Sequence, residues 1–321
     1  MRLITGGSGF LGAALARLLL EKGLDVRVFD LKPSPALPPE VDFRRGDVRD
    51  PDAVADAVRG ASHVYHLAAL LPQRKAPRRL MRAVHVGGTE NVLNACAEHG
   101  AAGMVFLSSS EVYGKMKVIP SPEDAPKKPL AEYGRNKLET ESLCLRFAER
   151  HPLALSILRP PTLIGPGIFD EGIKMMMNQV RKGAPLPIIG AGKNRVQALD
   201  VGDCASAVFA CGESPRAASE IFNARADDVP SLLEVTTALV KHAGSKSKII
   251  KVPAALGVNA LRLLNVFGLS PMRPEHFELL TRDHVMDTRK IKEKLGWAPR
   301  WSYLESVKEM YDWFVREAKK A

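Results

Sequence analysis

A tyrosine and a lysine four residues apart, Tyr133 and Lys137, have the types and the spacing for proton transfer. This spacing places the phenol and the ammonium on one face of a helix. The pKa of an ordinary tyrosine is near 10, so we expect the lysine and a positively charged cofactor ring to lower it until a phenolate serves as general base. Ser109 follows an apolar run and could hydrogen-bond the same substrate oxygen. The three residues predict hydride transfer at a secondary alcohol.

A glycine-rich turn lies near the N-terminus, where Gly6, Gly9 and Gly12 recur every three residues. Glycine leaves bare backbone beside a pyrophosphate, and the following helix N-terminus supplies free N–H groups and a positive dipole. A strand–turn–helix unit can also use glycines simply to turn. The turn alone is therefore weak evidence for a dinucleotide.

Two aspartates strengthen the dinucleotide interpretation. Asp30 ends the second predicted strand, 18 residues beyond Gly12, where a carboxylate accepts hydrogen bonds from ribose hydroxyls and repels a 2′-phosphate. NAD is thus favoured over NADP, although the nearby Lys32 leaves NADP as a minor option. Asp47 follows the third predicted strand and could receive the adenine amino group, with a plain loop aspartate as the alternative.

The elements that must hold these residues alternate between strand and helix. The expected strands are residues 2–5, 25–30, a segment around 43, 63–67, 104–108 and 155–159, and the expected helices are 10–22, 51–59, 78–99 and one carrying Tyr133 and Lys137 to about 150. This alternation predicts an α/β fold, a Rossmann-type doubly wound parallel sheet. We expect an NAD-binding domain over 1–165, with strands returning from about 196–225, and a smaller C-terminal substrate-binding lobe over 166–321.

Composition narrows the function classes. The chain has 321 residues, 45% of them hydrophobic, and a formal net charge of +10. Its four scattered cysteines predict neither disulfides nor a metal site, and we expect a cytoplasmic protein without a membrane span. The basic stretch 73–82 predicts a solvated face, with a phosphorylated substrate as the alternative; sparse aromatics argue against nucleic acid. The apolar segment 254–269 suggests a core helix, or else a ligand wall or a surface resting on a membrane.

Several ordered motifs together resemble one known family. They are Thr5-Gly6-x-x-Gly9-x-x-Gly12, Gly46-Asp47-Val48, His66-Leu67-Ala68-Ala69, Gly88-Thr89, Ser109-Ser110-Glu111-Val112-Tyr113-Gly114, Tyr133-x-x-x-Lys137, Leu158-Arg159-Pro160 and Leu295-Gly296-Trp297. The chain thus resembles the extended short-chain dehydrogenase/reductases, the NAD-dependent epimerase/dehydratase group. The resemblance implies a small-molecule substrate, a homodimer and a catalytic set of Ser109, Tyr133 and Lys137. It implies NAD contacts from Gly6, Ser8, Gly9, Phe10, Leu11, Gly12, Asp30, Asp47, Val48, Leu67, Ala68, Ala69, Tyr133, Lys137 and Pro160.

Departures from the family pattern concern the substrate side. His85 stands where the family usually has asparagine, Thr162 where sugar-nucleotide enzymes have asparagine, and Met272–His276 where they have Arg-Pro-Gly-Asp. Family dehydratases and decarboxylases place a glutamate at Glu111, which is a further catalytic candidate, with a hydrogen-bonded loop residue as the alternative. The candidate substrate contacts are Ser110, Glu111, Thr162 and Arg195.

We favour a nucleotide-sugar epimerase similar to UDP-glucose 4-epimerase, which oxidises a hydroxyl and returns the hydride to the other face of the ketone. One alternative is a dehydrogenase of a hydrophobic secondary alcohol, similar to 3β-hydroxysteroid dehydrogenase, suggested by Gly192-Lys193-Asn194-x-Val196 and the apolar segment 254–269. Another is a sugar-nucleotide decarboxylase or dehydratase that uses Glu111. A non-catalytic NAD-binding protein is the alternative from another class, and the intact serine, tyrosine and lysine argue against it.

Overall fold

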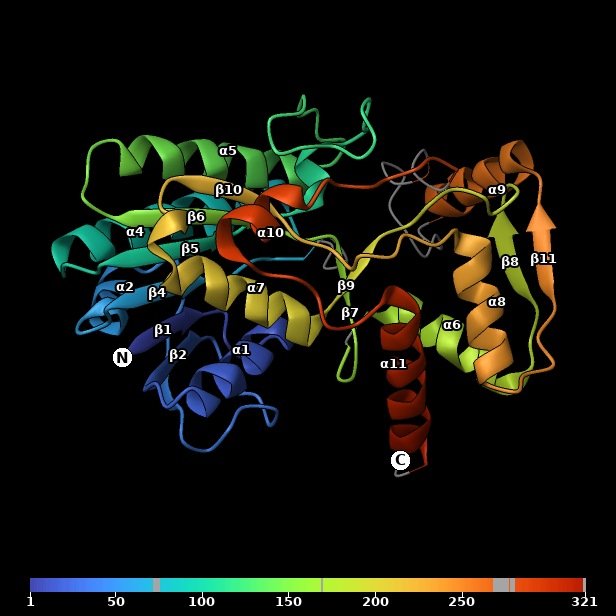
Figure 1. The fold of residues 1–321 in the computed structure, drawn as a ribbon, viewed down its shortest axis with the longest axis horizontal. Coiled ribbons are helices and arrows are strands. Elements are labelled where there is room, and N and C mark those ends of the chain that lie inside the picture. Colours follow the sequence, from blue (N-terminus) through green and yellow to red (C-terminus); the bar gives the residue numbers. More distant parts are fainter. Residues whose placement is uncertain (72–75, 169, 268–276, 278–280, 320–321) are drawn as a thin grey trace.

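A seven-stranded parallel sheet forms the larger part of the molecule (Figure 1). The computed structural model describes residues 1–71, 76–168, 170–267, 277 and 281–319. The strand order is β10-β6-β5-β4-β1-β2-β3, with β1 (Arg2–Thr5), β2 (Val26–Asp30), β3 (Asp42–Arg45), β4 (His63–His66), β5 (Gly103–Leu107), β6 (Ala154–Arg159) and β10 (Glu220–Asn223). The strand order changes sense between β1 and β4, because β2 and β3 follow on one side of β1 and β4, β5 and β6 on the other. In such parallel sheets the ligand crevice lies at this point, beyond the carboxyl ends of the strands. The predicted Rossmann-type, doubly wound sheet is confirmed.

Helices cover both faces of this sheet because its central strands are apolar on both sides. One face carries α1 (Phe10–Glu21) and α7 (Val201–Glu213), and the other carries α2 (Pro51–Val58), α4 (Gly88–Glu98) and α5 (Glu132–Ala148). Leu3 and Ile4, neighbours on β1, belong to the two different core clusters and are fully buried. Burial on both faces holds the strand ends, and therefore the crevice, in fixed positions.

The helix expected over residues 78–99 consists of three parts. These are α3 (Arg78–Arg82), a π-helical turn η1 (Ala83–Gly87) and α4. A π turn inserts an extra residue into a helix and is frequent at functional sites. Here it carries His85.

The C-terminal lobe has its own core, to which α6, α8 and α11 contribute. Its elements are β7 (Thr162–Ile164), α6 (Glu171–Lys182), β8 (Leu186–Ile189), β9 (Ala198–Asp200), α8 (Leu232–His242), β11 (Ile249–Val252), α9 (Ala254–Val266) and α11 (Tyr303–Ala318), while α10 (Arg289–Leu295) packs beside β10. Of the two returning strands, β10 joins the large sheet beside β6, whereas β9 pairs with β7 in a separate two-stranded sheet. The returning segment therefore crosses from the lobe to the sheet.

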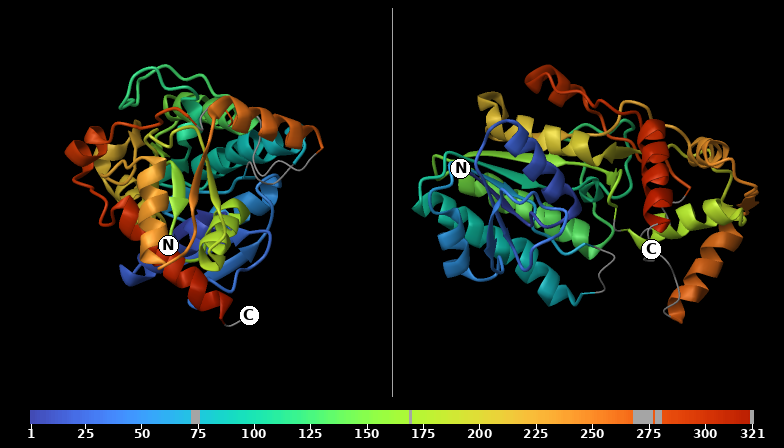
Figure 2. Two further views of the ribbon diagram at one scale, coloured as in Figure 1. Left: turned by 90° about the vertical axis from the view of Figure 1, so that its right-hand side faces the viewer. Right: turned by 90° about the horizontal axis from the view of Figure 1, so that it is seen from below.

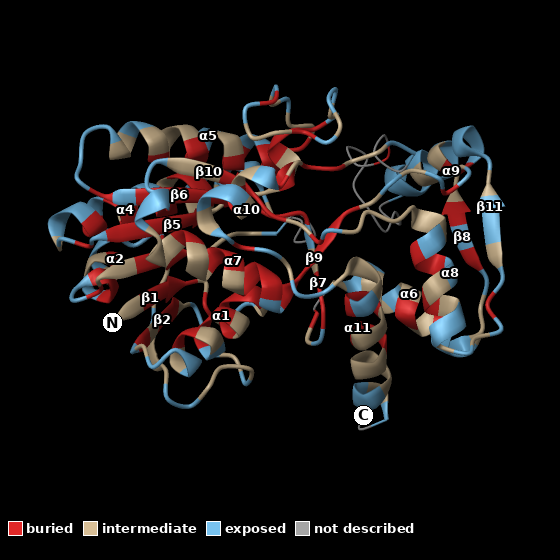
Figure 3. Ribbon diagram, viewed as in Figure 1, coloured by how far each residue is buried: buried red, intermediate tan, exposed pale blue. Residues whose placement is uncertain are grey.

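The core position suggested for the apolar segment 254–269 is wrong. The helix α9 forms, but Gly257 is its one buried residue, and Figure 3 shows most of the helix as intermediate or exposed. Residues 268 and 269 lie outside the described part, as do Met272–His276 and, within the basic stretch 73–82, Arg74 and Lys75.

Three further expectations concern membrane spans, metal sites and disulfide bonds. None of the helices in the described part is both long and apolar enough to cross a membrane. Within the same ranges, no group of three or more His, Cys, Asp or Glu side chains could hold a metal ion. All four cysteines are buried free thiols.

Candidate active site

The predicted catalytic residues meet at the carboxyl edge of the sheet. Strand β5 ends at Leu107, Ser109 follows as the N-cap of a short 3-10 turn, η2 (Ser110–Val112), and Tyr133 lies in the first turn of α5. Gly134 allows this approach, because a Cβ there would lie 2.7 Å from the Glu111 carbonyl oxygen. The helix that carries Tyr133 is therefore packed directly against the turn that begins at Ser109.

Lys137 is almost completely buried and held by backbone. Its ammonium donates a hydrogen bond to the Leu107 carbonyl oxygen at 2.6 Å and lies 5.7 Å from the centre of the Tyr133 ring. Burial lowers the pKa of Lys137 to about 8. The predicted pairing of Lys137 with Tyr133 on one helix face agrees with this geometry.

The environment of Tyr133 differs from the expectation in one respect. Burial raises the pKa of its phenol, and the negative charge of Glu111 raises it further. The Lys137 ammonium, 5.7 Å from the centre of the ring, does not offset the loss of hydration. The expected lowering of the pKa, which also requires the positively charged cofactor ring, is not produced by the protein groups alone, and with these groups the phenol is protonated at neutral pH.

The glycine turn fits a pyrophosphate. A Cβ on Gly9 would meet a single atom within 4 Å, the Gly6 carbonyl oxygen at 3.3 Å, so the space beside this residue is open. Gly9 is the N-cap of α1, and no side chain caps the first-turn N–H groups. Gly6 has a φ of +70°, and a Cβ there would lie 2.7 Å from the Ala68 backbone. The N–H groups in the first turn of a helix, beside a bare backbone, can hold phosphate oxygens.

The two predicted aspartates already have partners within the protein. The Asp30 carboxylate accepts hydrogen bonds from the backbone N–H of Ser8 at 3.0 Å and of Leu31 at 2.7 Å. It thereby ties the glycine turn to the end of β2, and its position at the strand end matches the prediction. Asp47 is held by Arg49, whose hydrogen bonds lower the pKa of the Asp47 carboxyl.

The other predicted cofactor contacts surround the same crevice. Leu67 is buried after β4, and its N–H bonds to the Thr5 carbonyl oxygen. The Pro160 carbonyl oxygen, beyond β6, accepts from the Ser110 N–H at 2.9 Å. Phe10 packs against both the sheet core and the lobe core. The remaining members of the predicted set lie in the first turn of α1 or in the segments that follow β3 and β4: Leu11, Gly12, Val48 and Ala69.

His85 joins the cofactor side to the catalytic side. Its Nε2 accepts a hydrogen bond from the Leu70 N–H at 3.0 Å, and its ring meets the Tyr133 ring edge-on with centres 5.4 Å apart. Burial lowers the pKa of His85 to about 3, and the Lys137 charge lowers it as well. The neutral imidazole thus holds the segment after β4 against the catalytic tyrosine.

The substrate side contains a residue that sequence reasoning missed. His284 is partly buried, its Nδ1 lies 3.0 Å from the Gln197 amide nitrogen, and burial lowers its pKa to about 4 while Glu111 raises it. Glu111 thus acts electrostatically on both His284 and Tyr133. No sequence motif marks His284, because it belongs to a segment more than 150 residues beyond Tyr133 in the chain.

The other substrate candidates do not gather at one point. Arg195 is half exposed, and Asp283 accepts from its Nε at 2.8 Å and from its backbone N–H at 2.7 Å. Thr162 is exposed on β7, whereas Ser110 is buried in η2. The predicted set is therefore split between the turn after β5 and the lobe.

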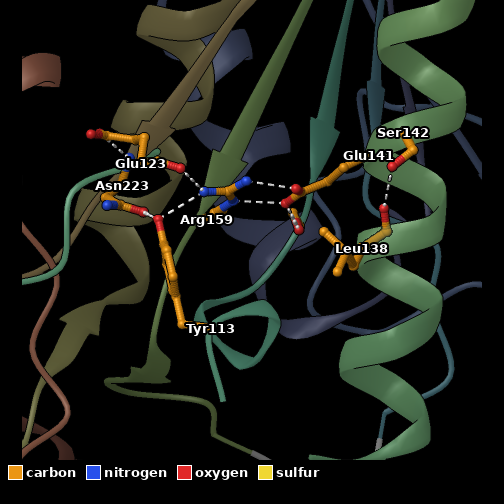
Figure 4. Close-up of polar contacts among 8 residues, drawn as sticks. Tyr113, Glu123, Leu138, Glu141, Ser142, Arg159 and Asn223 are labelled. Carbon is orange, nitrogen blue, oxygen red and sulfur yellow. Dashed lines mark hydrogen bonds and ion pairs between the residues drawn. The ribbon is translucent and has the colours of Figure 1, made fainter. Parts of the chain in front are cut away.

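A buried ionic network braces the catalytic helix. Arg159 at the end of β6 is fully buried and makes two hydrogen bonds to Glu141 on α5, at 2.8 and 2.7 Å (Figure 4). It also donates to the Tyr113 hydroxyl at 2.7 Å and to the Glu123 carbonyl oxygen at 2.8 Å. Asn223 on β10 accepts from the same Tyr113 hydroxyl. The network fixes α5 relative to β6, β10 and the loop that follows η2.

The sequence and the fold of this chain are similar to those of known proteins. The model of the "NAD dependent epimerase/dehydratase family" matches residues 2–224. The chain is 34% identical to the uncharacterised protein y4nG of Sinorhizobium fredii, over 97% of this chain and 78% of that one. It is 27% identical to 3beta-hydroxysteroid-dehydrogenase/decarboxylase isoform 1 of Arabidopsis thaliana, over 97% and 79%. The structure of MoeE5 with UDP-glucose and NAD is similar with a TM-score of 0.81 and 26% identity, over 99% of both chains. This chain therefore belongs to the NAD dependent epimerase/dehydratase family, enzymes that use NAD as cofactor on a Rossmann fold.

Proposed function

We propose that the enzyme interconverts a secondary alcohol and a ketone, with Ser109, Tyr133 and Lys137 as its catalytic residues. The observation that carries this is the packing of the first turn of α5 against the turn after β5, at the same edge of the sheet as the glycine turn. The hydroxyl, the phenol and the ammonium are thereby presented to the crevice where the family holds its cofactor. We also propose that Asp30 contacts the adenosine ribose.

Tyr133, Ser109 and Lys137 have different roles in the proposed proton transfer. NAD supplies the hydride acceptor or donor when bound. The Tyr133 hydroxyl is protonated at neutral pH because of burial, so it can donate a proton to a carbonyl oxygen during reduction and recover it during oxidation. Ser109 holds that oxygen by a hydrogen bond, and the Lys137 charge stabilises the phenolate.

For the substrate we propose a lipophilic secondary alcohol. Arg195, the cation expected to meet a substrate, is neutralised by Asp283 through two hydrogen bonds. A diphosphate would therefore have to compete with a carboxylate for this guanidinium. The adjacent Val196 contributes no charge, and Thr162 offers a hydroxyl in place of the amide of sugar-nucleotide enzymes. The similarity to the Arabidopsis hydroxysteroid dehydrogenase/decarboxylase supports the same class.

A nucleotide-sugar epimerase similar to UDP-glucose 4-epimerase is the second candidate. The likeness to MoeE5, whose structure holds UDP-glucose and NAD, extends over 99% of the chain and favours it. In that reaction the ketone turns over in the site and the hydride returns, so no NADH accumulates. Glu111, whose charge is felt by Tyr133, would provide the acid or base needed for a decarboxylase or dehydratase variant.

The experiment records NADH absorbance while the purified enzyme and NAD receive sterols, long-chain secondary alcohols, or UDP- and dTDP-sugars, with product analysis by mass spectrometry. Lasting NADH with a lipophilic alcohol supports the first candidate. An epimerised sugar without lasting NADH supports the second, and NADH with loss of carbon dioxide from a sugar acid supports the decarboxylase. Turnover of any substrate that persists in Y133F would contradict the catalytic assignment.

A further inference from the structure

A stripe of apolar side chains on α9 faces solvent. Leu256 and Leu263 on α9 and Phe267, the C-cap of this helix, are 64%, 61% and 69% exposed, and Ala260 is exposed as well. Their positions follow one another by four, three and four residues, which places them on one side of a helix. We call these four residues the α9 stripe.

The other side of α9 is fixed to the lobe. A Cβ on Gly257 would lie 2.9 Å from the Ile189 side chain on β8, so the helix lies directly on that strand. Gly257 and the α9 stripe therefore lie on different sides of the helix. Figure 2 shows α9 standing out from the lobe, at the end away from the large sheet. A rigid support holds the stripe outward.

The segment that leads into α9 and α9 itself carry positive charge. Lys248 and Lys251 border or lie on β11, the strand paired with β8, and both are exposed. Arg262 is exposed on α9 itself. The sequence contains no aspartate or glutamate between Glu234 and Glu275. The apolar stripe is thus combined with cations that no neighbouring acid in the sequence offsets.

We infer that α9 docks the enzyme onto an anionic phospholipid surface. An amphipathic helix with apolar residues on one side and basic residues around them lies in the plane of a membrane interface, its apolar side chains among the lipid chains and its cations near the phosphates. A second copy fits this face less well. In a symmetric pair with the α9 stripes against each other, both partners would bring cations and no nearby acid in the sequence to the same interface. The inference concerns location and is independent of the substrate.

The experiment is sedimentation of the full-length protein with vesicles of phosphatidylcholine alone or mixed with phosphatidylglycerol, without NAD or substrate. We expect binding to the mixed vesicles and little to the neutral ones, with a decrease as salt is added. The variant L256Q/L263Q/F267Q should partition at least about tenfold less. The variant K248Q/K251Q should lose about fivefold for each lysine. The control V118Q changes another exposed apolar residue, 54% exposed and far from α9 in the sequence, and should bind as the wild type does.

Three results would overturn the inference. Equal binding by the wild type and by the stripe variant would exclude the α9 stripe as the contact. Loss of a dimer in the stripe variant by gel filtration, without vesicle binding by the wild type, would assign the face to a second copy. A lower Tm of the stripe variant, again without vesicle binding, would show that another part of the same chain covers it. None of these results bears on alcohol oxidation, which the NADH assay measures separately.

Discussion

The catalytic edge of the large sheet buries charged side chains, whereas the outer face of the lobe exposes apolar ones. At the catalytic edge Lys137, Glu141 and Arg159 are 2%, 2% and 0% exposed, and each is hydrogen-bonded. On the lobe, Leu256 and Phe267 face solvent from a helix with an ordinary apolar pattern. Buried charges are costly unless they are paired, and exposed apolar side chains gain nothing without a covering surface. This difference supports the proposed catalytic site at the sheet edge and the proposed docking role of the lobe face.

Removal of the Tyr133 hydroxyl tests the catalytic edge most severely. Y133F keeps the ring against His85 and removes only the group that transfers the proton. We expect turnover to fall by about 10²–10⁴-fold, the usual contribution of general acid–base catalysis. NAD titration by fluorescence should give an unchanged affinity. Turnover near the wild-type rate would end the proposed mechanism.

Disruption of the buried ion pair tests whether the catalytic edge depends on its charges for folding. R159M leaves Glu141 buried without its partner, and we expect a loss of about 3–5 kcal/mol in urea unfolding. R316M, which removes the exposed partner of Glu309, is the matched control and should cost under about 1 kcal/mol. Similar losses in both variants would erase the distinction between the two regions.

The buried Lys137 should make stability depend on pH. Burial lowers its pKa to about 8 from 10.5, so between these values the unfolded chain binds a proton that the folded chain does not. Stability from this group is therefore absent below pH 8 and rises toward pH 10.5, by up to about 3 kcal/mol. Urea unfolding of the wild type and K137M across this range measures the difference. Parallel pH profiles would contradict the lowered pKa.

Replacement of Asp30 tests the cofactor side of the crevice. D30A removes the acceptor at the end of β2, and NAD binding should weaken by about 1–3 kcal/mol if the carboxylate bonds the ribose. The same change also releases the Ser8 N–H, so the Tm is measured in parallel. An NAD affinity equal to that of the wild type would refute the ribose contact.

Polar substitution on α9 should have the smallest effect on folding. L256Q/L263Q changes two exposed side chains, and we expect the free energy of unfolding to stay within about 0.5 kcal/mol of the wild type for each. L19Q, in the fully buried core on α1, is the contrasting control and should be strongly destabilising. A large loss in the α9 variant would mean that the stripe is buried in solution.

Local spacing by itself determined much of the cofactor and catalytic side. The alternation of strands and helices predicted the doubly wound sheet because each unit buries an apolar face against its neighbour. The spacing of Tyr133 and Lys137 placed both on one helix face, and the glycines at 6, 9 and 12 marked the turn before α1. These features depend on contacts within a few residues, which a sequence displays directly.

Tertiary structure alone decided which distant groups meet. His284 reaches Gln197, Arg159 pairs with Glu141, and Asp283 neutralises Arg195, although no local pattern links these residues. For the same reason the core position predicted for α9 was wrong. The spacing of apolar residues shows that one side of a helix is apolar, but not what packs against that side. The packing of the lobe, with Gly257 lying on Ile189, left the α9 stripe facing outward.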